Sequence, residues 1–149
     1  MPDKIDLILA HGCFDVLHIG HIRYLKAAKA LGNSLIVTIT ADQYISKGSG
    51  RPVFNEDYRK EVLESLKFID LVEILYEPTG VSGILKYEPD IYAKGHDYKG
   101  KSGNLDLERQ AVESYGGKLV IIESQPQYSS TAILTGKLLK DLQTVNLLK

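Results

Sequence analysis

The chain has a single cysteine, almost no net charge and no long apolar run, and each of these features argues against a class of protein. Its 149 residues include one cysteine, which excludes an internal disulfide and suits a reducing compartment. The formal net charge is −1, whereas nucleic-acid-binding proteins usually carry a clear basic excess. No apolar run approaches the length of a membrane span, and the N-terminus lacks the apolar core of a signal peptide. We therefore expect a cytoplasmic protein that binds neither nucleic acid nor membrane.

The remaining composition is that of an ordinary globular protein. Hydrophobic residues make up 44% and charged residues 25%, and the length suits a single domain over residues 1–149. Apolar runs predict strands at 7–10, 34–40, 71–76, 90–94 and 119–122. Helices are predicted from His18 to Gly32 and over 56–67, 79–88, 105–115 and 130–142. This alternation predicts an α/β, Rossmann-like domain with a five-stranded parallel sheet and helices on both faces.

Residues 11–21, with the sequence HGCFDVLHIGH, join the first predicted strand to the first predicted helix. His18 and His21 stand at the start of this helix, where free N–H groups and the helix dipole attract phosphate. Gly20, between them, lets a phosphate approach the backbone. Two histidines three residues apart could instead bind a metal, but no cysteine or carboxylate cluster has zinc-like spacing. We therefore predict a phosphate site here and no protein-bound metal.

Polar segments also follow the second, fourth and fifth predicted strands, at residues 47–51, 94–98 and 129–131. The carboxyl ends of parallel strands lie at one edge of a sheet, and ligands bind outside that edge. These segments are therefore expected to meet the histidine segment at one site. Each also has an ordinary explanation, since Lys47 could be a solvated loop lysine and residues 129–131 a plain helix N-cap.

Residues 12–15 (Gly-Cys-Phe-Asp) and 18–21 (His-Ile-Gly-His) resemble the signature of the cytidylyltransferase-like nucleotidyltransferases, which is Gly-x-Phe-Asp followed by His-x-Gly-His. Within this family the chain is most similar to the heptose 1-phosphate adenylyltransferase branch. It shares three segments with that branch: Lys47-Gly48, Arg51-Pro52 and the Lys-Gly-x-Asp-Tyr pattern of residues 94–98. The resemblance implies an enzyme that transfers AMP from ATP to a sugar phosphate, such as heptose 1-phosphate, and releases pyrophosphate.

The same resemblance implies which residues form the site. The implied catalytic residues are His18, His21 and Lys47, which would stabilise charge on the phosphates. The implied nucleotide-binding residues are Gly12, Cys13, Phe14, Asp15, Gly20, Arg59, Lys94, Gly95, Asp97, Ser129, Ser130 and Thr131. Mg²⁺ is the implied cofactor, bound mainly through the nucleotide phosphates. A homodimer is expected, because members of the family are often dimers.

Several of these residues have a second interpretation or depart from the family. Arg59 is expected either to reach the phosphates or to lie exposed on its helix, paired with Glu56 or Glu61. Lys94 is expected to meet the acceptor phosphate, and Cys13 to be a small buried residue of the turn. The structure of the loop around His96, which replaces a family glycine, is open. His11, where the heptose branch more often has Asn, is left out of the predicted site.

Three other functions stay open on the sequence. A CTP-dependent glycerol-3-phosphate cytidylyltransferase would use the same chemistry, but its typical Arg-Thr-Glu-Gly-Ile-Ser-Thr-Thr stretch is absent. A flavin mononucleotide adenylyltransferase shares the fold. A nucleotide-binding module without turnover is the third alternative, and the presence of His18, His21 and Lys47 argues against it.

Overall fold

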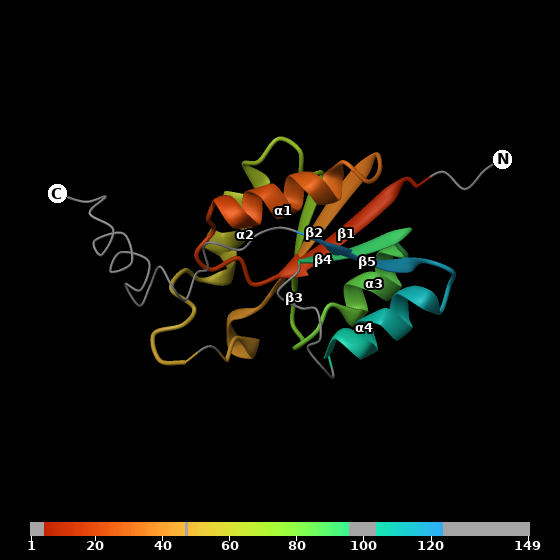
Figure 1. Cartoon of the computed structure of the whole chain (residues 1–149). Coiled ribbons are helices and arrows are strands. Elements are labelled where there is room, and N and C mark those ends of the chain that lie inside the picture. The colour runs from red at the N-terminus through yellow and green to blue at the C-terminus, as the bar shows by residue number, and fades with distance from the viewer. Residues whose placement is uncertain (1–4, 47, 96–103, 124–149) are drawn as a thin grey trace, which may run out of the picture.

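Five parallel strands form one sheet in the order β3-β2-β1-β4-β5 (Figure 1). The strands are β1 (Leu7–Gly12), β2 (Ser34–Thr40), β3 (Leu71–Leu75), β4 (Ile91–Gly95) and β5 (Lys118–Ile122). The structure is a computed structural model that describes residues 5–46, 48–95 and 104–123. The predicted α/β fold with a five-stranded parallel sheet is confirmed, and the predicted strands match the observed ones except for small differences at their ends.

The central strand is β1, and its sequence explains why. Ile8, Leu9 and Ala10 are fully buried, because both faces of the sheet are covered at this strand. A strand buried on both faces reads as a continuous apolar run instead of an alternating one. β1 pairs with β2 along its whole length and with β4 over these three residues. The chain thus places the end of β1 between the ends of two other strands.

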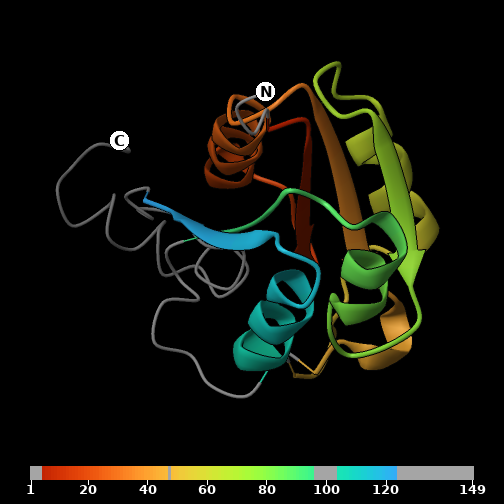
Figure 2. The same ribbon diagram turned by 90° about the vertical axis from the view of Figure 1, so that its right-hand side faces the viewer.

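Two helices cover each face of the sheet (Figure 2). On one face, α1 (Ile19–Lys29) and α2 (Glu56–Glu64) pack their apolar side chains against the larger core. On the other, α3 (Val81–Tyr87) and α4 (Asn104–Glu113) form the smaller core around the fully buried Leu9 and Tyr92. Within the described residues, no helix combines the length and apolarity needed to cross a bilayer.

The helix boundaries correct some of the sequence expectations. α1 ends at Lys29, with Ala30 as C-cap, and Gly32 does not have the positive φ of a terminating glycine. Gly32 instead permits close packing, since a Cβ there would lie 3.1 Å from the Asp6 carbonyl oxygen. α2 ends at Glu64, before the predicted Lys67, because the Ser65 N–H turns back to the carbonyls of the last turn. The predicted helix at 130–142 lies outside the described residues, so a single domain over the whole chain stays a prediction.

The strand order reverses at the junction of β1 and β4. From β1 the chain continues to β2 and β3 on one side, and β4 and β5 lie on the other. In open parallel sheets, ligands bind in the crevice outside the carboxyl ends of the strands at such a switch point. Here the strands that meet at this junction end at Gly12 and Gly95. The fold therefore brings residues 13–18 to the place where a ligand is expected.

Candidate active site at the carboxyl ends of the strands

The turn that follows β1 depends on Gly12 and Phe14. Phe14 has φ of 53°, in the left-handed region, and its side chain is 5% exposed. A non-glycine residue rarely adopts this backbone conformation, and the buried aromatic ring supplies the packing that holds it. Gly12 must be small, because a Cβ there would lie 3.1 Å from the Phe14 ring. This turn directs the residues that follow it toward the N-terminus of α1.

His18 and His21 form a reciprocal cap on α1. His18 is the N-cap, and its Nδ1 accepts a hydrogen bond from the Gly20 N–H at 3.1 Å. In return, His21 Nδ1 accepts from the His18 N–H at 3.2 Å. The two rings stack with centroids 3.8 Å apart, and the Phe14 ring lies edge-on to His21 at 5.2 Å. The predicted pair is therefore brought together, with both rings oriented by the backbone.

These caps decide which ring nitrogen can act on a ligand. An imidazole nitrogen that accepts a hydrogen bond carries no proton, so the neutral rings of His18 and His21 hold their proton on Nε2. Both side chains can therefore donate from Nε2 at the N-terminus of a helix. That location also favours anions through the positive end of the helix dipole. The pair can donate hydrogen bonds to an acceptor such as a phosphoryl oxygen.

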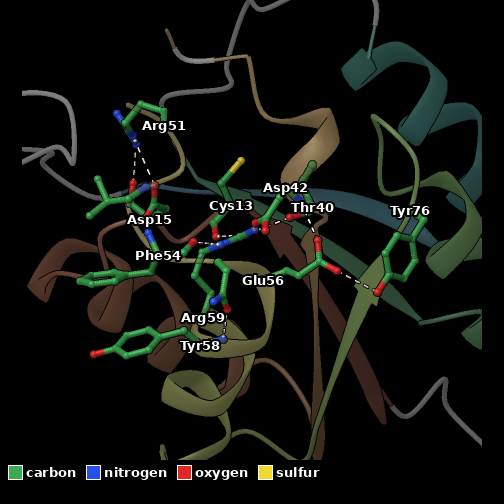
Figure 3. Close-up of polar contacts among 12 residues, drawn as sticks. Cys13, Asp15, Thr40, Asp42, Arg51, Phe54, Glu56, Tyr58, Arg59 and Tyr76 are labelled. Carbon is green, nitrogen blue, oxygen red and sulfur yellow. Dashed lines mark hydrogen bonds and ion pairs between the residues drawn. The ribbon is translucent and has the colours of Figure 1, made fainter. Parts of the chain in front are cut away.

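Asp15 ties this turn to the loop that precedes α2 (Figure 3). Its buried carboxylate accepts from the Val53 N–H at 2.6 Å, the Phe54 N–H at 3.0 Å and Arg51 Nε at 3.3 Å. Arg51 also donates to the Asp15 carbonyl oxygen. Two segments that lie 36 to 39 residues apart are thus joined through a single carboxylate.

The ionised form of Asp15 is favoured by these donors. Burial by itself would raise the pKa of Asp15, but the hydrogen bonds from Phe54, Val53 and Arg51 outweigh it. The pKa of Asp15 therefore lies below its ordinary value. The carboxylate contributes stability above the ordinary pKa of an aspartate, and this contribution is lost as the pH falls through the lowered value.

Arg59 joins the same turn to the end of β2. Its side chain is 1% exposed, and its guanidinium donates to three backbone carbonyls and one carboxylate (Figure 3). The acceptors are Phe54 O at 3.0 Å, Cys13 O at 3.0 Å, Thr40 O at 2.9 Å and Asp42 Oδ1 at 2.7 Å. The alternative expectation, an exposed arginine paired with Glu56 or Glu61, is wrong. Glu56 instead binds the Asp42 N–H and the Tyr76 hydroxyl.

Cys13, in the same turn, was predicted to be buried and is not. It is half-exposed, not buried, because its carbonyl and not its thiol turns inward to meet Arg59. The thiol is shown pointing away from the guanidinium in Figure 3.

Lys94 lies inside the protein near the end of β4. It is 2% exposed, and its Nζ donates to the His11 carbonyl oxygen of β1 at 3.1 Å. The His11 ring is held from β2, with Nδ1 2.9 Å from Thr38 Oγ1 and Nε2 3.3 Å from Thr40 Oγ1. Burial, and then the charge of Lys94, lower the pKa of His11 to about 3. His11 is therefore a neutral, fixed part of the β1–β4 junction at physiological pH.

The predicted residues Lys47, Asp97, Ser129, Ser130 and Thr131 lie outside the described residues, and their roles stay predictions. Gly95 is the last residue of β4, and Gly20 lies in the first turn of α1. Among the described residues, no three His, Cys, Asp or Glu side chains are grouped so that they could hold a metal ion.

Asp42 and Arg51 take part in these contacts without having been assigned to the site. Glu108, whose Oε2 accepts from the Gly80 N–H at 2.7 Å, was not predicted either. Arg51 was visible only as part of the Arg-Pro pattern, and Asp42 has no local signal because its partner is 17 residues away. Glu108 did have a signal. It follows Leu105 by three residues and precedes Ala111 by three, so it lies on the apolar face of its helix.

Comparisons with known proteins agree on the family. A model of the cytidylyltransferase-like family matches residues 9–136. The bifunctional protein HldE of Campylobacter concisus is 43% identical over 100 residues, which are 66% of this chain and 21% of that protein. HldE of Methylobacillus flagellatus is 36% identical over 130 residues, 86% of this chain and 26% of that protein. The chain therefore spans about a quarter of the length of these relatives.

Two solved structures share the fold. A lipopolysaccharide core biosynthesis protein from Thermoplasma volcanium matches with a TM-score of 0.64 and 30% identity, over 83% of this chain and 98% of that one. Pantothenate synthetase from Thermus thermophilus matches with a TM-score of 0.60 over 86% of this chain and 61% of that one. Its sequence identity is 13%, so this second likeness concerns the fold alone.

Replacing Asp15 by Asn should destabilise the protein in a pH-dependent way. At pH 7 we expect a loss of about 2 kcal/mol in the free energy of unfolding, because the charged acceptor of buried donors is removed. The difference from wild type should shrink below about pH 4, where protonation removes the same charge from the wild-type carboxylate. Urea unfolding between pH 7 and pH 3 measures this. A constant difference across that range would contradict the role of the charge.

Replacing Arg59 by Met should cost about 3 to 5 kcal/mol of unfolding free energy, because it leaves Asp42 and buried carbonyls without their donor. Arg23→Met, at an exposed position of α1, is the matched control and should change stability by less than about 0.5 kcal/mol. Thermal and urea unfolding of both variants test this. An unchanged stability in Arg59→Met would show that the contacts contribute nothing.

Proposed function

Because this chain belongs to the cytidylyltransferase-like family of nucleotidyltransferases, we propose that it transfers an adenylyl group from ATP to a phosphorylated sugar, such as heptose 1-phosphate, and releases pyrophosphate. The observation that carries the proposal is the stacked pair His18 and His21 at the N-terminus of α1. Both rings are oriented to donate from Nε2 at the edge of the sheet where ligands of this fold bind.

The proposed reaction is an in-line displacement at the α-phosphorus of the nucleotide. An oxygen of the acceptor phosphate forms the new bond, and the bond to pyrophosphate breaks. The acceptor is already ionised at neutral pH, so neither a general base nor a covalent protein nucleophile is required. The protein has to position two polyanions and stabilise the charge that develops between them.

The histidine pair suits this task. Negative charge builds on the α-phosphoryl oxygens in the transition state, and a donor already oriented toward them loses no energy in reorganising. The backbone hydrogen bonds at Nδ1 supply that orientation for His18 and His21. The positive end of the α1 dipole adds to the same field. Asp15 and Arg59 act behind this site by holding the turn that leads to it.

The cations and hydroxyls complete the proposed site. We assign Lys47 to the nucleotide phosphates, Asp97 to the nucleoside, and Ser129, Ser130 and Thr131 to the pyrophosphate end. Support for these roles is the family resemblance of their segments. Lys94 is assigned to the acceptor phosphate, and its place at the β1–β4 junction supports this.

Mg²⁺ would enter with the nucleotide and neutralise phosphate charge. The described residues fit an ion held mainly by phosphates, because they offer no cluster of three protein ligands. The homodimer and the cytoplasmic location stay predictions. A sugar phosphate acceptor is favoured by the likeness to a lipopolysaccharide core biosynthesis protein and to HldE, together with the segments shared with the heptose branch.

Pyrophosphate release should be observed with Mg²⁺, ATP and heptose 1-phosphate. The assay crosses ATP and CTP with heptose 1-phosphate, glycerol 3-phosphate and flavin mononucleotide. Release with CTP and glycerol 3-phosphate would replace the proposed substrates by those of the cytidylyltransferase branch. Nucleotide binding without release in any combination would favour a binding module over an enzyme acting on these acceptors.

His18→Asn should separate catalysis from helix capping. Asparagine is a preferred N-cap, so its amide oxygen can replace Nδ1 and stability should stay within about 1 kcal/mol of wild type. The Nε2 donor is lost, and kcat should fall about a hundredfold or more. His18→Ala should lose the same turnover and, in addition, about 1 kcal/mol of stability.

Lys26→Ala, at an exposed position of the same helix, is the control for this pair and should keep wild-type turnover. Steady-state kinetics and urea unfolding are measured on all three variants. Near-normal kcat in His18→Asn would rule out a role for the His18 donor.

A further inference from the structure

A cluster of buried polar side chains lies between the sheet and helices α3 and α4. Figure 2 shows these two helices together on one face of the sheet. We call it the junction cluster. Its members are His11, Thr38, Thr40, Tyr92, Lys94 and Glu108, and each is 6% exposed or less. The proposed transfer uses only Lys94 from this set. Buried polar groups are costly unless they are satisfied, so the others require an explanation.

Glu108 is the buried carboxylate of the cluster. It projects from α4 with 4% of its surface exposed, and its Oε2 accepts from the Gly80 N–H at 2.7 Å. A Cβ added to Gly80 would lie 3.1 Å from this oxygen, 2.9 Å from the Tyr92 hydroxyl and 3.1 Å from the His11 ring. The carboxylate, the phenol and the imidazole therefore converge on one backbone position at the start of α3.

Lys94 is the buried cation of the cluster. Its Nζ lies 3.1 Å from the His11 carbonyl oxygen and 5.6 Å from the centre of the Tyr92 ring. Burial lowers the pKa of Lys94 below its ordinary value, and the charge of Glu108, followed by Cys13, opposes this lowering. The titratable groups that face Lys94 within the described residues are His11 from β1, Cys13 from the turn, Tyr92 from its own strand and Glu108 from α4. Among these groups Glu108 supplies the largest opposing charge, since His11 is neutral.

The position of Lys94 and Glu108 in one buried cluster gives the two charges a use. A lysine ammonium out of water is expensive to maintain, and a buried counter-ion offsets part of that cost. The Lys94–His11 hydrogen bond spans the switch point between β1 and β4, where a phosphate-bearing ligand is expected. An ammonium kept there in its charged form can exchange the His11 carbonyl for a phosphate oxygen.

We propose that Glu108 is a positioning residue that keeps Lys94 charged and directed across the β1–β4 junction, ready for the phosphate of the acceptor. The inference rests on the proposed function for the identity of the ligand. It adds a residue on α4, outside every motif of the sequence, to the set that determines how the acceptor is bound. Glu108 acts through Lys94 and does not touch substrate.

The test is Glu108→Gln, which removes the charge while its amide oxygen can still accept from the Gly80 N–H. Without the anion, Lys94 should lose its proton at a lower pH. The alkaline limb of the pH profile of kcat/KM for the sugar phosphate should therefore move to lower pH. For a shift of one pKa unit the loss approaches about tenfold at a pH above both midpoints, and it should largely disappear well below them. The KM for ATP should stay within about twofold.

Two further variants keep the result interpretable. Glu108→Asp retains the charge and should restore most of the wild-type profile. Glu113→Gln removes an exposed carboxylate of the same helix and should leave the profile unchanged. Urea unfolding confirms that each variant is folded. A profile in Glu108→Gln that is lowered equally at every pH would indicate a merely structural role and overturn the proposal.

A second readout does not depend on turnover. Nitrogen NMR of lysine side chains, with Lys94→Arg to assign the signal, follows the protonation of the Lys94 amine directly. We expect its titration midpoint to be lower in Glu108→Gln than in wild type. Equal midpoints would overturn the inference even if the enzyme is active. A lowered midpoint in a protein that transfers nucleotide to no acceptor would instead overturn the proposed function and leave the Glu108–Lys94 coupling standing.

Discussion

The site depends first on the buried carboxylate of Asp15. A chain that leaves β1 through a left-handed residue needs something to hold the turn, and Asp15 does so by accepting three donors from the loop before α2. Because those donors are 36 to 39 residues away, the turn and the loop form as one unit. The direction of α1, and with it the placement of His18 and His21, follows from this connection.

The polar side chains around the site fall into two groups by what they contact. Asp15, Arg51, Arg59 and Lys94 are buried or nearly so and are bonded to backbone or to one another, so they shape the site from behind. His18 and His21 are held at Nδ1 by the backbone contacts and present Nε2. This separation keeps strong charges in a low-dielectric framework and leaves the Nε2 proton donors at the N-terminus of α1.

Some expectations taken from the sequence are confirmed and others are wrong, and each outcome has a physical reason. The strands were predictable because parallel strands buried on both faces must be apolar throughout, as residues 7–10 are. His18 and His21 were expected together at the start of the helix, and they do meet there because the N-cap and the residue three positions later cap each other's backbone. For Arg59 only the exposed alternative is wrong, and nothing near it in sequence shows that three backbone carbonyls accept from its guanidinium. The predicted burial of Cys13 is wrong as well, because its carbonyl oxygen turns inward to Arg59 and its thiol does not.

The sequence by itself determined the α/β fold, and the resemblance of residues 12–15 and 18–21 to the cytidylyltransferase-like signature indicated the family. The fold follows from local patterns, namely apolar runs and helix spacing. Only the tertiary structure decided which charges are buried and what each one holds. Glu108 illustrates the difference, because its place on the apolar face of α4 is written in the sequence, whereas its contact with Gly80, 28 residues away, is not. Such contacts depend on how helices pack across the sheet, and that geometry exists only once the chain has folded.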